Sequence, residues 1–199
     1  MKAAETAIVL VGYQNDYFAD DGILREFVEG HARDATLHNT IKLLEVVKDM
    51  SELLVIATPI QFTPDYSEIT EPVGILKAII DVGAFRKGQK GTETIPMISD
   101  LGDRVVQVPG RRGLNAFSNT DLEDVLRKNG IRNVVIAGVV TSLCIDSTAR
   151  SAFDRDFQVY ILSDCTAGRT DTEQNFYAHE VFPMYSQVIG FEEFLQEIN

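Results

Sequence analysis

The stretch from Asn133 to Phe153 reads NVVIAGVVTSLCIDSTARSAF and decides the fold of the chain. It opens with a short apolar, β-branched run, Val134–Ala137, which predicts a strand buried on both faces and ended by Gly138. From Ser142 onward the apolar residues fall at helical spacing, so the strand turns sharply into a helix. A buried strand followed at once by a helix is typical of a parallel α/β sheet.

Cys144 falls in the first turn of this predicted helix. Unpaired backbone N–H groups and the positive end of the helix dipole favour negative charge there, which biases a thiol toward the nucleophilic thiolate. The alternative is that Cys144 is a small buried hydrophobe, as most cysteines are. Because open α/β sheets bind ligands beyond the carboxyl ends of their strands, the position of Cys144 favours a functional thiol.

The composition describes an ordinary globular chain. Its 199 residues, 45% hydrophobic and 24% charged, fit one domain over residues 1–199 with a sizeable core. The net charge of −12 argues against nucleic acid or an anionic membrane surface as a partner. The sequence shows no basic-then-apolar leader and no apolar run of membrane-spanning length, so we expect a cytoplasmic protein. Two cysteines, Cys144 and Cys165, are too few for a disulfide framework, and no CxxC pair offers a zinc site.

Apolar runs that predict strands alternate along the chain with segments of helical spacing. The predicted strands are Ala7–Val11, Leu53–Ala57, Arg104–Val108, Val134–Ala137, Val159–Leu162 and Gln187–Ile189. The predicted helices are Ala32–Met50, Pro72–Val82, one that starts at a capping box of Thr120 and Glu123 and ends at Gly130, Ser142–Phe153, Thr172–Tyr185 with a break at Pro183, and Phe191–Ile198. This alternation predicts a single α/β domain with a doubly wound, six-stranded parallel sheet and helices on both faces.

The carboxyl ends of parallel strands lie along one edge of the sheet, so the loops that follow the first four strands are expected to share a site. Arg111 or Arg112 would place a permanent cation near Cys144 there, although both arginines can equally be solvated loop charges. The long connection from Pro59 to Gly91 is expected to build part of the site. The converging loops are Gly12–Phe18, Thr58–Asp65, Pro109–Gly113 and Val139–Cys144.

Three segments at this edge resemble a known family. They are YQNDYF at positions 13–18, PGRRGLNAF at 109–117, and GVVTSLC at 138–144 with the helix that follows it. Together they resemble the isochorismatase-like cysteine hydrolases, a group that includes nicotinamidases, N-carbamoylsarcosine amidases and isochorismatases. The resemblance covers nearly the whole chain, and GVVTSLC is its most specific part. It implies a six-stranded parallel sheet, a small-molecule substrate, and a homodimer or larger homo-oligomer.

The resemblance also implies roles for single residues. The catalytic cysteine of the family falls on Cys144, and the backbone N–H groups of Val140 and Cys144 would form an oxyanion hole beside a cis peptide bond between Val139 and Val140. The family's triad lysine falls on Arg111 and its triad aspartate on Gly12. Glycine cannot transfer a proton, and arginine keeps the positive charge without acting as an acid or base near neutral pH.

This altered triad leaves two hypotheses open. In the first, another carboxylate on the converging loops replaces the aspartate, and the chain hydrolyses an amide-like or ureide-like C–N bond of a small molecule through a Cys144 thioester. In the second, the chain is an impaired binding or regulatory relative in which Arg111 holds a carboxylate ligand. A redox-sensing thiol is disfavoured, because no resolving cysteine is identifiable by spacing. The candidate carboxylates are Asp16, Asp65 and Glu71, with a structural, loop-capping role as the alternative for Asp16.

Nicotinamidase-type members carry a D-x-H metal-ligand motif just after the second strand, where this chain reads Pro59-Ile60-Gln61. None of the three histidines falls in that loop, so we expect no catalytic metal and no cofactor. Gln61 and Phe62 would then line a substrate pocket, with a solvent-facing Gln61 as the alternative. Cys165 is expected to be a packed thiol. The full set of pocket candidates is Gly12, Asp16, Phe18, Gln61, Phe62 and Thr141.

Overall fold

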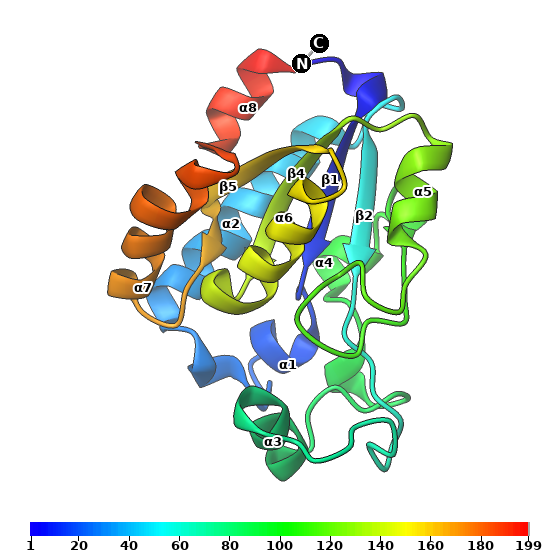
Figure 1. The fold of residues 1–199 in the computed structure, drawn as a ribbon, viewed down its shortest axis with the longest axis vertical. Helices are drawn as coiled ribbons and strands as arrows, with labels where there is room; N and C mark the ends of the chain where they lie inside the picture. The colour runs from blue at the N-terminus through cyan, green and yellow to red at the C-terminus, as the bar shows by residue number, and fades with distance from the viewer. Residues whose placement is uncertain (199) are drawn as a thin grey trace.

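The computed structural model describes residues 1–198 and shows one six-stranded sheet between two layers of helices (Figure 1). All paired strands are parallel, in the order β3-β2-β1-β4-β5-β6. The predicted doubly wound, six-stranded parallel sheet is therefore confirmed. The strands are β1 Thr6–Val11, β2 Leu54–Thr58, β3 Val106–Gln107, β4 Asn133–Val139, β5 Gln158–Ala167 and β6 Gln187–Ile189.

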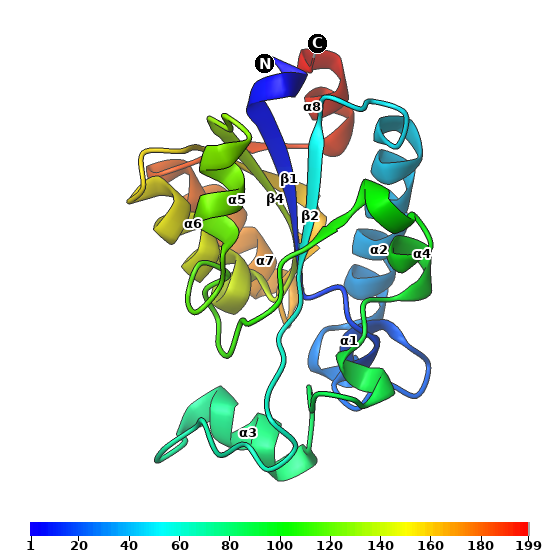
Figure 2. The same cartoon turned by 90° about the vertical axis from the view of Figure 1, so that its right-hand side faces the viewer.

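Helices α2 and α4 lie on one side of the sheet, and α5 and α6 lie on the other (Figure 2). Gly130 follows α5 with a φ of +68°, the left-handed conformation expected of a glycine just past a helix end. Among residues 1–198, no helix has both the length and the apolar composition needed to cross a membrane. The helices are α1 Asn15–Phe18, α2 Gly30–Val47, α3 Gly74–Val82, α4 Pro96–Ser99, α5 Leu122–Lys128, α6 Asp146–Phe153, α7 Asp171–Phe176 and α8 Phe191–Glu197. The predicted helix 172–185 continues from α7 through a π-helical turn, Tyr177–Val181, and a 3-10 turn, Phe182–Met184, that contains Pro183.

The two central strands, β1 and β4, are buried along almost their whole length, because helices cover both faces of the sheet. Gly138 does not end β4 as predicted, since the strand runs on to Val139. The glycine has a φ of +132°, and a Cβ atom there would overlap the carbonyl oxygen of Val11 in β1. Gly138 therefore allows two backbones to approach closely inside the sheet, which is a different use of glycine from ending a strand.

Two other predicted strands have different lengths. The edge strand β3 keeps only Val106 and Gln107, because Arg104 lies in a 3-10 turn, where its guanidinium donates to four carbonyl oxygens between Val47 and Leu53. Strand β5 extends to Ala167, so Cys165 lies inside it rather than after it. Cys165 is fully buried, and burial raises the pKa of its thiol, as expected for a packed cysteine.

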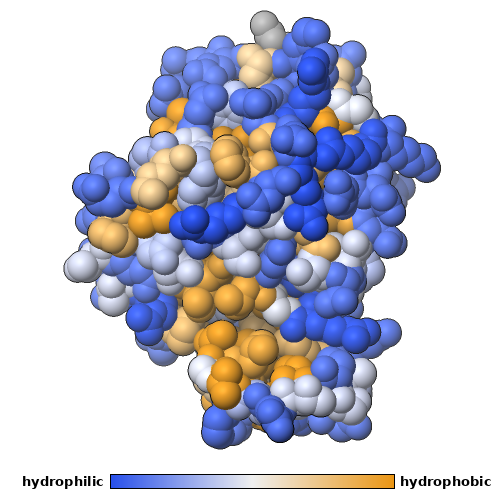
Figure 3. Space-filling model, in the orientation of Figure 1, coloured by the Kyte–Doolittle hydropathy of each residue, from blue (hydrophilic) through white to orange (hydrophobic). Residues whose placement is uncertain are grey.

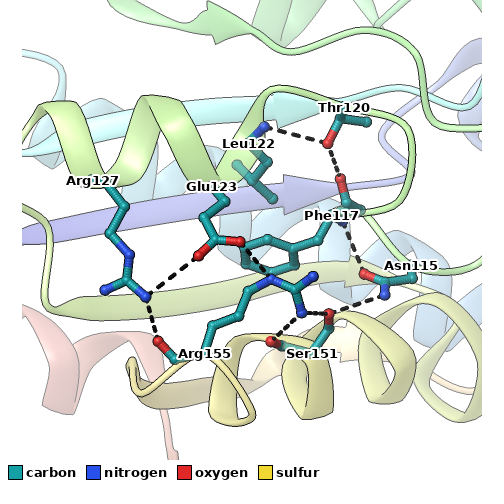
Figure 4. Close-up of polar contacts among 9 residues, drawn as sticks. Asn115, Phe117, Thr120, Leu122, Glu123, Arg127, Ser151 and Arg155 are labelled. Carbon is teal, nitrogen blue, oxygen red and sulfur yellow. Dashed lines mark hydrogen bonds and ion pairs between the residues drawn. The ribbon is translucent and has the colours of Figure 1, made fainter.

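The predicted capping box at the start of α5 is wrong. Thr120 Oγ1 accepts a hydrogen bond from the Leu122 amide at 3.3 Å, but Glu123 does not reach back to complete the box. Its carboxylate forms ion pairs with Arg155 at 2.8 Å and Arg127 at 3.5 Å (Figure 4). Two guanidinium groups within reach of one carboxylate provide stronger, charge-assisted partners than a backbone amide does.

The connection from β2 to β3 carries α3 beyond the carboxyl ends of the strands, away from the sheet (Figures 1 and 2). Its flanking segments are fastened to the loop after β1. The Gln14 side chain donates to the carbonyl oxygens of Ile60 at 2.8 Å and Thr92 at 2.7 Å, and Asp16 Oδ2 accepts the Phe85 amide at 2.7 Å. The connection therefore forms a fixed part of the edge where the predicted loops converge.

Candidate active site

Cys144 lies just after β4, beside β1, where the order of the strands reverses. Residues 141–145 form a π-helical turn that runs directly into α6, so the predicted change from strand to helix is present with a wider first turn. The amides of Leu143 and Ile145 both donate to the carbonyl oxygen of Val140, at 3.0 and 3.2 Å. This reversal point is where doubly wound sheets bind their ligands.

The residues just before this turn have unusual backbone geometry. The peptide bond between Val139 and Val140 is cis, at the place where the family resemblance implies one. Within residues 1–198, no hydrogen bond joins the Val140 amide to another group, and the Cys144 amide makes none outside its own turn. The Val140 amide is therefore not committed to the backbone around it.

Two hydrogen bonds hold the Cys144 turn against the start of α7. Thr141 Oγ1 donates to Gln174 Oε1 at 2.5 Å, and Ser142 Oγ donates to Glu173 Oε1 at 2.6 Å. The other oxygen of Glu173 pairs with Arg169 at 3.1 Å. Burial works to raise the pKa of Glu173, but the hydrogen bonds from Ser142 and Arg169 outweigh it and hold the pKa below its usual value. Sequence reasoning missed this clamp, because Glu173 and Gln174 are distant in sequence and match no motif.

Arg111 is completely buried, whereas Arg112 is exposed. The backbone of Arg111 lies beside Ile60 in a parallel bridge. Its Nη1 donates to the carbonyl oxygen of Leu114 at 3.3 Å. Its Nε and Nη2 have no hydrogen-bond partner among residues 1–198. A buried cation without a partner is costly, so these two nitrogens are the most unusual polar atoms of the site.

The segment after Arg111 is fastened to the helix that follows Cys144. Asn115 Nδ2 donates to Ser151 Oγ at 3.0 Å, and the Ala116 amide donates to Thr148 Oγ1 at 3.0 Å. Arg155 also donates to Ser151 Oγ, at 2.5 Å, and joins this segment to Glu123 of α5 (Figure 4). These bonds fix the loop after β3 relative to α6.

Tyr17 is a buried residue of α1, the helix that follows β1. Burial raises the pKa of its hydroxyl far above the usual value; charge on Cys144 raises it further, Arg111 opposes the rise and Asp16 adds to it. The Tyr17 ring packs against Phe85 with centroids 5.3 Å apart. The sequence pattern did not single out Tyr17.

Gly12 directly follows β1, at the position where the family resemblance implies an aspartate, and has a φ of +79°. A Cβ atom at this position would lie 2.7 Å from the carbonyl oxygen of Val139 and 3.3 Å from its Cγ2 atom. Both the left-handed backbone and the close approach of Val139 disfavour any side chain here. An aspartate at position 12 would therefore require a different backbone path.

Asp16 is buried and holds the β2–β3 connection in place. Its Oδ2 accepts the Phe85 amide, and its Oδ1 faces Gly91 so closely that a Cβ atom there would overlap it. Burial raises the pKa of Asp16, and the hydrogen bond from Phe85 opposes that rise. These contacts favour the structural alternative for this carboxylate.

The remaining candidates differ in burial and in their contacts. Phe18 and Phe62 are buried in the core, and the Thr141 hydroxyl is committed to Gln174. Gln61 is half-buried and lines a separate cavity of about 460 Å³ together with residues 92–94. The other two candidate carboxylates, Asp65 and Glu71, are exposed.

A groove of about 340 Å³ opens over the Cys144 turn, between that turn and α3. Figure 3 shows apolar surface gathered at this end of the molecule. Cys144 is 2% exposed and Arg111 is fully enclosed, so neither reaches the groove. Since Ser142 and Leu143 directly precede Cys144, this groove is the surface opening adjacent to the thiol. It is lined by Ile75 and Ala78 of α3, by Ser142 and Leu143, and by Phe27, Gly74 and Arg169.

One group of three potential metal ligands occurs within residues 1–198. Glu29, His31 and Asp171 place ligand atoms within 4.8 Å of one another, and all three residues are exposed. His31 and Asp171 already bond to each other at 2.9 Å. An exposed cluster of this kind is common without an ion and does not indicate a metal centre.

Sequence comparison places this geometry within one family. The Isochorismatase domain model matches residues 6–193, which is nearly the whole chain. A ureidoacrylate amidohydrolase of Rhizobium rhizogenes is 31% identical over 182 residues, covering 83% of this chain and 72% of that protein. Nicotinamidase 3 of Arabidopsis thaliana is 27% identical over 131 residues, covering 66% of this chain and 63% of that protein.

Solved structures have the same fold. A cysteine hydrolase from Pseudomonas syringae pv. phaseolicola superimposes with a TM-score of 0.87 at 20% identity, covering 98% of this chain and 93% of that one. An N-carbamoylsarcosine amidase from Thermoplasma acidophilum gives a TM-score of 0.73 at 22% identity, with coverage of 94% and 97%. At such identities the likeness establishes the fold alone, but the domain match and the amidohydrolase relative go further: the chain belongs to the isochorismatase family.

Proposed function

We propose that this protein is a cysteine-dependent hydrolase that cleaves an amide-like or ureide-like C–N bond of a small molecule, with Cys144 as the nucleophile. The observation that carries the proposal is the placement of Cys144 at the reversal point of the sheet, in a turn clamped to α7. The ureidoacrylate amidohydrolase, nicotinamidase and N-carbamoylsarcosine amidase named among its relatives and neighbours support the bond type.

The proposed reaction has two stages. The Cys144 sulfur attacks the carbonyl carbon, and the C–N bond then breaks as the leaving nitrogen takes up the proton that the thiol has lost, which releases an amine and leaves an acyl thioester on the sulfur. Water attacks the thioester and returns the free thiol with a carboxylic or carbamic acid. The uncommitted amide of Val140 is suited to stabilise the oxyanion formed at each stage, together with the Cys144 amide that the family resemblance implies.

None of the three residues considered for this role is suited to carry the thiol proton to the leaving nitrogen. Gly12 has no side chain, the Arg111 guanidinium stays charged, and Asp16 is engaged with Phe85. Losing one positioned acid–base group costs about 10²–10⁴ in rate, so we expect turnover to be slow relative to a complete triad.

A second candidate function is binding without turnover, and a specific observation favours it. The buried, partly unpaired Arg111 and the side-chain-free position 12 suit a site that holds an anionic ligand. Under this alternative, Cys144 would be dispensable for ligand binding.

The homodimer or larger homo-oligomer implied by the family resemblance stays a prediction under both candidates, and light scattering after size exclusion would test it.

The test compares wild type, Cys144→Ala and Cys165→Ala on a panel of small amides and ureides, with amine or ammonia release as the readout. Because Cys165 is a buried thiol outside the proposed chemistry, Cys165→Ala controls for loss of a cysteine as such. We expect Cys144→Ala to lose at least about 10³-fold in kcat/KM and Cys165→Ala to stay within a few-fold. Equal turnover by Cys144→Ala and wild type would refute nucleophilic catalysis, and no turnover by wild type on any substrate would favour the binding candidate.

A further inference from the structure

We infer that Arg111 is a carboxylate-binding residue, and that the carboxylate belongs to the small molecule on which Cys144 acts. The link to Cys144 chemistry rests on the proposed function, whereas the anion site itself does not. The family resemblance implies a proton-transferring lysine at this position. The arginine found there carries a charge and binds anions, but it does not transfer protons near neutral pH.

The first reason is the arrangement of the free donors. Nη1 of Arg111 is the nitrogen on the same side as Cδ, and it donates to the carbonyl oxygen of Leu114. Nε and Nη2 form the opposite edge of the guanidinium, and these are the two nitrogens without partners among residues 1–198. Two parallel N–H groups on one edge match the two oxygens of a carboxylate. The free edge therefore has the geometry of a bidentate carboxylate site.

The second reason is that the converging loops provide no side-chain anion for this edge. Position 12, where the family has its aspartate, is occupied by a glycine whose space is taken by Val139. Asp16 accepts the Phe85 amide, and Glu68 accepts the amide and the hydroxyl of Thr63. Since a buried guanidinium needs an opposite charge to offset its desolvation, the carboxylate is expected from a ligand.

The third reason is the location of Arg111 relative to the thiol. Arg111 follows β3 and is bridged to Ile60 after β2, while Cys144 follows β4, with β1 and Tyr17 between them. The loops that carry Arg111 and Cys144 therefore meet at the same edge of the sheet. Because the proposed ligand has to reach both residues, it is a compact acid whose carboxylate lies a few atoms from the bond that Cys144 attacks.

The experiment uses two alkylating reagents of nearly equal size on the intact protein. Iodoacetate carries a carboxylate and iodoacetamide does not, so the ratio of their rates at Cys144 reports anion binding without requiring turnover. Labelling is quantified by peptide mapping at constant ionic strength in the Cys165→Ala background. The net charge of −12 disfavours iodoacetate in general, so a preference for it cannot come from the overall field.

We expect the iodoacetate-to-iodoacetamide ratio at Cys144 to exceed that of free cysteine by at least about 10-fold in wild type. Arg111→Met should reduce the ratio to that of free cysteine, and Arg111→Lys should reduce it in part. Arg112→Met is the matched control, because Arg112 is the exposed neighbour and its loss should leave the ratio unchanged. Should an Arg111 variant fail to fold, competition by acetate against both reagents in wild type tests the same site.

A ratio equal to that of free cysteine in wild type would overturn the inference, as would an equal ratio in wild type and Arg111→Met. Absence of labelling by either reagent in the folded protein would also overturn it, because a ligand of this size could then not reach the thiol. Failure of the proposed function looks different: Cys144→Ala would hydrolyse the amide panel as wild type does. An anion preference at Cys144 without hydrolysis would keep the site and reject the catalysis.

Discussion

The loops after β1, β3 and β4 meet at the same edge of the sheet. The β4 loop matches the pattern that the family resemblance implies, whereas the β1 and β3 loops depart from it. The β4 loop keeps the cysteine and holds it with two side-chain hydrogen bonds to α7. The other two loops carry Gly12 and Arg111 at the positions where the family resemblance implies an aspartate and a lysine. Each loop must therefore be judged on its own contacts.

The largest expected effect comes from restoring the aspartate on the β1 side. Gly12→Asp should lower the free energy of unfolding by at least about 2 kcal/mol, because a left-handed non-glycine residue costs about 1–3 kcal/mol and its Cβ would press on Val139. We also expect no gain of hydrolysis. Gly12→Ala is the matched control, since it adds the Cβ without the carboxylate. A gain of hydrolysis in Gly12→Asp but not in Gly12→Ala would contradict this expectation and would show that the aspartate by itself completes a working triad.

The next effect has the opposite sign. Arg111→Met removes a buried, partly unpaired charge while keeping a side chain of similar length. We expect the free energy of unfolding in the absence of ligand to rise by roughly 1–3 kcal/mol, as is seen when buried charges are replaced by apolar groups. Urea denaturation of wild type, Arg111→Met and Arg112→Met measures this. A clear loss of stability in Arg111→Met would mean that the guanidinium is satisfied inside the protein.

A smaller effect tests the clamp on the β4 side. Glu173 has a lowered pKa in the folded protein, so its charge stabilises the fold above the ordinary glutamate pKa, and that stability is lost as pH falls through the folded value. Glu173→Gln should therefore cost about 1 kcal/mol at pH 7 and progressively less below about pH 4.5. Glu180→Gln, an exposed acid in the turn after α7, serves as the control. A cost that does not depend on pH would contradict the assigned ion pair with Arg169.

The smallest effect separates structure from catalysis at Asp16. Its pKa is raised in the folded protein, so the ionised carboxylate opposes folding above that pKa, and the penalty disappears as pH falls through the folded value. An asparagine can still accept the Phe85 amide, so Asp16→Asn should leave kcat/KM within about two-fold and stability at pH 7 unchanged or slightly higher. A loss of 100-fold or more in kcat, with stability retained, would instead identify Asp16 as the missing base.

The sheet and the position of Cys144 could be predicted because they depend on local patterns. The continuous apolar runs of β1 and β4 indicate strands buried on both faces, and the helical spacing after Ser142 places the thiol at a turn. The errors concern contacts between distant segments. At position 138 a glycine is needed because the carbonyl oxygen of Val11 in the neighbouring strand occupies the space of a Cβ atom. Glu123 forms an ion pair with Arg155, which lies after α6, and so does not complete the capping box.

The chemistry of the edge depends even more on long-range packing. Arg111 and Arg112 are adjacent in the sequence and identical in type, yet only Arg111 is enclosed, because its backbone lies beside Ile60 at the end of β2. The clamp from Glu173 and Gln174 likewise joins segments about 30 residues apart.

The amino-acid sequence alone predicted the parallel sheet and the location of Cys144 at its edge. Both predictions depend on hydrophobic periodicity and on glycine positions, which are patterns that extend over only a few residues. The sequence also shows that positions 12 and 111 carry a glycine and an arginine, and neither side chain transfers protons near neutral pH. The tertiary structure determined which arginine is buried, which of its nitrogens have no hydrogen-bond partner, and which carboxylates already accept hydrogen bonds. Those properties arise only when loops far apart in the chain exclude solvent together, because burial and hydrogen bonding depend on neighbours that no local pattern specifies.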